Sequence, residues 1–146
     1  MIKVQTSEYF SEPKTRINSE AHINNAIDMD KQYAGKHLIL DLWGGDHLDD
    51  CAQLERVMRD AAEKAGATLL HIHLHRFTEG GGVTGVALLA ESHISVHTWP
   101  EHQFAAFDIF MCGRADPKVA ALVLEEGLKP TRTDMKLMKR GRIPSE

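Results

Sequence analysis

The alternation of hydrophobic and polar positions predicts several short strands in the middle of this chain. Five runs are rich in apolar and β-branched residues or alternate with a period of two: HLILDLW, TLLHIHLHRF, VTGVALLAES, HISVHTW and FAAFDIFMC. The clusters TEGGG and PEHQ separate neighbouring runs, as expected of turns between antiparallel strands. TRTDMKLM, near the end of the sequence, is predicted as a last strand.

Two segments have the spacing of amphipathic helices instead. Between Asp49 and Ala65 the apolar residues recur every three or four positions, and Gly66 follows where a helix often ends with a glycine. Asp116 followed by Pro117 is typical of a helix start, and this helix should run towards Gly127. Because strands outnumber helices, we expect an α+β fold, a two-layer sandwich with an antiparallel sheet and helices packed on one face.

The beginning of the chain differs from the rest. Residues 1–35 are polar, and Ile23, Ala26 and Ile27 could form at most one weak helical stripe. We therefore predict an N-terminal extension over residues 1–35, of unknown role, and one compact domain over residues 36–146.

Composition narrows the classes of function. Hydrophobic residues make up 42% and charged residues 26%, and no apolar run approaches the roughly 20 residues of a membrane span. The formal net charge of −4 is spread along the chain, which argues against nucleic-acid binding and favours a small-molecule ligand. Cys51 and Cys112 are too few for a disulfide framework, and no stretch resembles a signal peptide, so we expect a cytoplasmic protein.

Candidate chemistry gathers between Gly85 and Gly113, where a hydroxyl, imidazoles, carboxylates and a thiol lie on two adjoining strand runs. In HISVHTW the period of two places Ile94 and Val96 on one face and the polar residues His93, Ser95 and His97 on the other. One face can build a core while the other remains available for chemistry.

The sequence ESHISVHTWPE followed by AAFDIFMCG resembles the processing and active-site signature of bacterial S-adenosylmethionine decarboxylases. The similarity extends upstream through GKHLILDLWGGD and GVTGVALLAESH, so it covers residues 35–113 well and the C-terminal part loosely. This resemblance implies a homodimer that decarboxylates S-adenosylmethionine to the aminopropyl donor of spermidine synthesis. The domain of residues 36–146 would then be a pyruvoyl-dependent decarboxylase domain.

The resemblance also implies that the precursor cuts itself between Glu91 and Ser92. In the family, the serine attacks the preceding carbonyl and ends as a pyruvoyl group on the new chain, so no diffusible cofactor is needed. A serine hydroxyl is a weak nucleophile and needs a strained peptide and a nearby base, which a turn flanked by His97 could supply. On its own, Ser92 could equally be a turn serine bonded to its own backbone.

Further catalytic roles follow from the same resemblance. Cys112 matches the cysteine that returns a proton after carbon dioxide leaves, and a thiol with a pKa near ~8.5 is still protonated at neutral pH. His97 matches the histidine that completes self-processing, and imidazole moves protons readily in this range. Thr84 stands where the family usually has a serine that assists processing, and it keeps the hydroxyl. Packing roles for Cys112 and His97 remain the alternatives.

Three more residues match positions that contact substrate in the family. Phe77 and Trp99 would lie against the adenine, and Glu101 would face the ribose hydroxyls. Aromatic rings near a sulfonium cation add an attraction of about 0.5 to 2 kcal/mol. Phe77 and Trp99 could equally be core residues.

Other readings of the sequence stay open. His71, His73 and His75 share one face of a strand and could hold a transition metal, although no second ligand pair stands at a suitable spacing and we assign no metal site. Thr84, a longer TEGGG loop, Met111 and HQF after WPE depart from the family pattern. A decarboxylase of a basic amino acid, ornithine or arginine, is therefore the second candidate, and a processing-dead partner subunit is the third.

Overall fold

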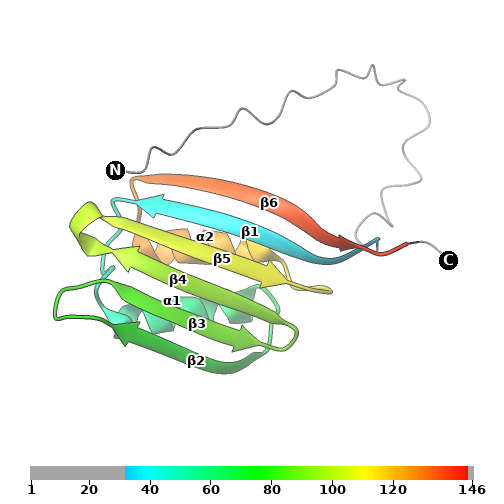
Figure 1. The fold of residues 1–146 in the computed structure, drawn as a ribbon, viewed down its shortest axis with the longest axis horizontal. Helices are drawn as coiled ribbons and strands as arrows, with labels where there is room; N and C mark the ends of the chain where they lie inside the picture. Colours follow the sequence, from blue (N-terminus) through cyan, green and yellow to red (C-terminus); the bar gives the residue numbers. More distant parts are fainter. Residues whose placement is uncertain (1–31, 145–146) are drawn as a thin grey trace, which may run out of the picture.

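The computed structural model describes residues 32–144 and confirms the predicted α+β class. Its six-stranded antiparallel sheet has the order β2-β3-β4-β5-β1-β6, and both helices cover the same face (Figure 1). The strands are β1 (Tyr33–Trp43), β2 (Leu69–Arg76), β3 (Val83–Leu89), β4 (Ser92–Trp99), β5 (Phe104–Met111) and β6 (Arg132–Arg142). The helices are α1 (Cys51–Lys64), α2 (Pro117–Leu128) and the short 3₁₀ helix η2 (Pro100–His102).

The core lies between the helices and the sheet, where every second strand residue points inward. In β1 and β5 the inward residues are fully buried, among them Leu40, Phe107 and Ile109, and they meet Leu54 of α1 and Leu124 of α2. Burying one such side chain contributes about 1.5–3 kcal/mol, so this alternation determines which face of each strand looks outward.

The helix boundaries follow their capping residues. The side chain of Asp50 accepts hydrogen bonds from the backbone of Ala52 and Gln53 at the start of α1, and Gly66 takes a positive φ just past its end, as predicted. Asp116 caps α2 in the same way, with Pro117 as the first helical residue.

Helix α2 continues through Gly127 and ends at Leu128, with Lys129 in the left-handed conformation. Gly127 serves helix packing here, because a Cβ at this position would lie 2.6 Å from Cγ1 of Val57. The glycine thus allows α1 and α2 to approach closely.

Strands β2 and β6 form the two edges of the sheet. Strand β6 pairs with β1 as far as Tyr33 opposite Arg142, so residues 33–35 of the predicted N-terminal extension belong to the sheet. Residues 1–31 of the predicted extension lie outside the described residues. Strand β6 carries a series of basic side chains: Arg132, Lys136, Lys139, Arg140 and Arg142.

The sheet face opposite the helices, here called the outer face, is covered by no helix of residues 32–144 (Figure 1). The predicted alternation in β4 is confirmed, since Ile94 and Val96 are fully buried while His93, Ser95 and His97 keep exposed surface on the outer face. The polar residues of this strand are therefore available for binding or catalysis.

Candidate active site

The turn between β3 and β4 is strained at the predicted cleavage point. Leu89 pairs with Ser92, so Ala90 and Glu91 alone connect the strands. Glu91 has a φ of 60°, a conformation that costs a residue with a side chain about 1–2 kcal/mol. The N–H of Ala90 donates to the carbonyl oxygen of Thr68 at 2.8 Å, which anchors the turn. The Glu91–Ser92 peptide therefore lies in a backbone that is both strained and fixed.

Cys112 lies beside this turn, directly after β5. Its thiol donates to the carbonyl oxygen of Glu91 at 2.9 Å, and its backbone N–H donates to Oγ of Ser92 at 3.3 Å. A donor on a carbonyl oxygen stabilises the negative charge that develops there when a nucleophile attacks the carbon. We call Glu91, Ser92 and Cys112, which lie at the predicted cleavage point, the cleavage cluster.

Thr84 and His97 form a second polar pair, directly opposite each other on β3 and β4. Oγ1 of Thr84 and Nδ1 of His97 are 3.0 Å apart and share a hydrogen bond. His97 does not flank the Ser92 turn, because five residues along β4 separate them by about 16 Å. Within one chain, His97 is therefore too far away to act as a base for Ser92.

Phe77 and Trp99 lie near Thr84 and His97, and the core alternative does not hold for them. Their exposed fractions are 65% and 39%. Gly82 lies between their backbones, since the N–H of Phe77 donates to the Gly82 oxygen and a Cβ on Gly82 would lie 2.5 Å from the Thr98 oxygen. Two strand spacings, about 9.5 Å, thus separate the backbones of the two aromatic residues.

Glu101 follows in η2, where its side chain is exposed. The sequence did not reveal Phe104, whose ring stacks on Trp99 with centroids 5.3 Å apart and fixes the indole. We call these five residues the recognition cluster: Phe77, Trp99 and Glu101, which the resemblance predicts to contact substrate, and Thr84 and His97, which it predicts to assist processing.

The two clusters lie at opposite ends of β4. Ser92 begins this strand and Trp99 ends it, a distance of about 23 Å for an extended chain. In Figure 1 the β3–β4 turn and the β4–β5 connection mark these two ends of the sheet.

Comparison with known proteins decides the family. A sequence profile described as S-adenosylmethionine decarboxylase matches residues 36–141, from β1 almost to the end of β6 and including both clusters. The chain belongs to the S-adenosylmethionine decarboxylase family.

Individual members agree with this assignment. A protein from Methanococcus aeolicus named S-adenosylmethionine decarboxylase proenzyme is 49% identical over 75% of this chain and 96% of its own length. Proenzyme 2 of Halalkalibacterium halodurans is 42% identical over 75% of this chain and 88% of its own. The crystal structure of the adenosylmethionine decarboxylase from Aquifex aeolicus superposes with a TM-score of 0.71 at 35% identity, covering 79% of this chain and 97% of that one.

This family member also carries three carboxylates on neighbouring strands of the outer face. Burial raises the pKa of Asp41 above its ordinary value, and the negative charges of Asp134 and Asp108 raise it further. Asp41 lies directly opposite Asp134 in the β1–β6 register, and Arg132 donates to Asp134 at 2.8 Å. This juxtaposition depends on strand pairing, so the local sequence gave no sign of it.

The histidines of β2 do not converge. His71, His73 and His75 are exposed on the outer face, and each is about 6.6 Å from the next along the strand. Among residues 32–144 no three histidine, cysteine, aspartate or glutamate side chains lie close enough to hold a metal ion.

None of the helices of residues 32–144 has the length and apolar composition of a membrane span.

Proposed function

We propose that this chain is the precursor of a pyruvoyl-dependent S-adenosylmethionine decarboxylase, which forms its own cofactor from Ser92 and supplies the aminopropyl donor for spermidine synthesis. One observation carries the proposal beyond family membership. The thiol of Cys112 donates to the carbonyl oxygen of Glu91, at the strained peptide that precedes Ser92.

The cleavage cluster supplies the nucleophile, the strained peptide and the oxyanion donor for self-processing. Attack by Oγ of Ser92 on the Glu91 carbonyl carbon converts the amide into an ester, and Cys112 can donate to the oxygen as it becomes negative. Elimination then releases Glu91 as a carboxylate, and hydrolysis consumes water and releases ammonia to leave a pyruvoyl group at residue 92. The strain at Glu91 favours this reaction because the cut relieves it.

A bound pyruvoyl group supplies a carbonyl that takes up the electron pair left by carbon dioxide. The protein's own residues do the rest. Cys112, already in contact with residues 91 and 92, is placed to return a proton. We place the adenine ring between the exposed side chains of Phe77 and Trp99, and Glu101 can accept hydrogen bonds from ribose hydroxyls.

The separation of the two clusters supports a homodimer with shared active sites. A substrate held by Trp99 cannot reach residue 92 of the same chain, about 23 Å away along β4. A second copy packed on the outer face with two-fold symmetry can place its recognition cluster over the cleavage cluster of the first. His97 of one copy would then serve Ser92 of the other, and each dimer would contain two equal sites.

Mass spectrometry and a substrate panel test this proposal. The purified protein should resolve into fragments 1–91 and 92–146, the second without a free α-amine, and should release carbon dioxide from S-adenosylmethionine but not from ornithine or arginine. EDTA should leave both cleavage and turnover unchanged. A chain that stays intact at 16.3 kDa in fresh and aged samples would contradict self-processing. Turnover of ornithine or arginine would contradict S-adenosylmethionine as the substrate.

A further inference from the structure

Three aromatic side chains on the outer face lie next to the proposed cofactor position. We propose that His93, Phe110 and His37, the ring clamp, are positioning residues that hold residue 92 in place after the chain is cut. The inference rests on the proposed function, because it concerns the new chain end that cleavage would create.

The clamp is a continuous contact across three strands. His93 of β4 stacks on Phe110 of β5, with ring centroids 5.8 Å apart and an interplanar angle of 12°. The ring of His37 on β1 lies on the same phenyl group, with ring centroids 5.9 Å apart. Gly35 makes room for that ring, because a Cβ there would lie 2.7 Å from its Cζ atom. Phe110 is thus enclosed by two imidazoles and a glycine.

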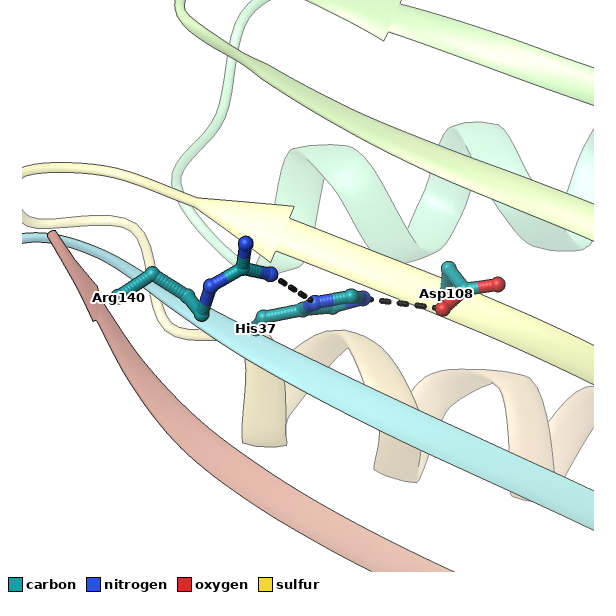
Figure 2. Close-up of polar contacts among 3 residues, drawn as sticks. All are labelled: His37, Asp108 and Arg140. Carbon is teal, nitrogen blue, oxygen red and sulfur yellow. Dashed lines mark hydrogen bonds and ion pairs between the residues drawn. The ribbon is translucent and has the colours of Figure 1, made fainter.

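His37 is itself fixed on both sides (Figure 2). Its Nε2 lies 2.9 Å from Oδ1 of Asp108, and its Nδ1 lies 3.1 Å from a guanidinium nitrogen of Arg140. A guanidinium can only donate, so Nδ1 must accept and Nε2 must carry the proton that it donates to Asp108. The outermost ring of the clamp therefore has one orientation and one tautomer.

Cleavage makes such an anchor necessary. In the precursor, residue 92 is held by the peptide bond to Glu91 and by its pairing with Leu89. After the cut it is the first residue of a strand, without an N–H, and strand ends tend to fray. His93 is the first side chain after it, so the stack on Phe110 is the nearest contact that can keep the reactive carbonyl in place. A displacement of about 1 Å at a reacting group can cost about 100-fold in rate.

Two variants disturb the clamp in different ways. His93→Ala removes the stacked ring, and Gly35→Ala pushes Phe110 away while leaving all three rings present. In cleaved protein, each should lower kcat by about 10- to 100-fold and leave KM within about twofold, because neither variant changes a residue of the recognition cluster. Hydrogen exchange of the amides of residues 93–96 should become faster in the cleaved form of both variants and change little in the Ser92→Ala precursor background.

Matched variants separate positioning from general structure. His93→Phe keeps a flat ring and should retain most of kcat, and His73→Ala, on the outer face of β2, should behave as wild type. Wild-type kcat and unchanged hydrogen exchange in cleaved His93→Ala and Gly35→Ala would overturn the ring clamp. Failure of either variant to cleave would also overturn it, because these rings would then act before the cut. A wild-type chain that neither cleaves nor turns over substrate would instead remove the proposed function.

Discussion

The two ends of β4 are built in opposite ways. At the Ser92 end, the groups contact each other beside a strained turn: the Cys112 thiol donates to the Glu91 carbonyl oxygen at 2.9 Å, and the Cys112 N–H donates to the Ser92 hydroxyl at 3.3 Å. At the Trp99 end, the aromatic side chains of Phe77 and Trp99 are exposed on either side of Gly82. A reaction of the chain with itself needs internal contacts, whereas recognition of a ligand needs surface that the chain leaves unfilled.

Ser92→Ala should have the largest effect, because it removes the attacking oxygen at the Ser92 end of β4. Without the attacking oxygen the chain should remain a single 16.3 kDa species, and decarboxylation of S-adenosylmethionine should be absent. Mass spectrometry and carbon dioxide release measure both. Ser95→Ala, on the outer face of the same strand, is the control and should cleave like wild type.

Cys112→Ala should affect both activities of that end. Decarboxylation should fall by about 10² to 10⁴-fold, the usual contribution of a general acid. Cleavage should slow by about tenfold or more, because the Glu91 carbonyl loses its donor. Cys112→Ser keeps a donor and should cleave faster than the alanine variant, and equal cleavage of wild type, serine and alanine variants would remove the thiol from processing.

Complementation tests whether the Ser92 end of β4 in one copy meets the Trp99 end of β4 in the other copy. Ser92→Ala and His97→Ala should each be inactive alone, yet their co-expression should restore about a quarter of wild-type activity, because half of the dimers are mixed and each mixed dimer has one intact site. Tagged chains purified together provide the sample for carbon dioxide release. Co-expression of Ser92→Ala with Cys112→Ala, both from the cleavage cluster, is the control without recovery. If isolated mixed dimers of Ser92→Ala and His97→Ala also show no decarboxylase activity, the active site is not shared between copies.

The smallest expected effect concerns stability on the outer face between the two ends. The raised pKa of Asp41 means that its ionised form destabilises the fold, a cost that is absent below about pH 3.8 and grows as pH rises through the folded-state pKa. Asp41→Asn should therefore raise the free energy of unfolding at pH 7 by about 0.2–1 kcal/mol and change it little near pH 3. Urea unfolding at one protein concentration measures this, with Asp60→Asn on α1 as control. A gain that persists at pH 3 would assign the effect to another cause.

Local pattern predicted the fold well because burial repeats with the period of each element. The alternation in β4 and the Asp116–Pro117 start of α2 were both visible in the sequence and are confirmed. The start of β1 was not visible in the local pattern, because pairing with β6, far along the chain, extends this strand back to Tyr33.

The site was harder to predict because sequence distance does not translate into spatial distance. Cys112 is 20 residues from Ser92 and contacts it, since β5 folds back on β4. His97 is only five residues from Ser92, and the extended strand carries it away. Asp108 and Arg140 reach His37 across sequence separations of 71 and 103 residues, which no local motif could reveal.

The basic side chains of β6 have a consequence for how copies of the chain associate. An edge strand presents unpaired backbone groups, and two such edges can join into a continuous sheet, the first step of many aggregates. Arg132, Arg140 and Arg142 lie along this edge, so two β6 strands brought together would repel each other. Self-association through this edge is thereby disfavoured, and copies can meet on the outer face without growing into open-ended chains of strands.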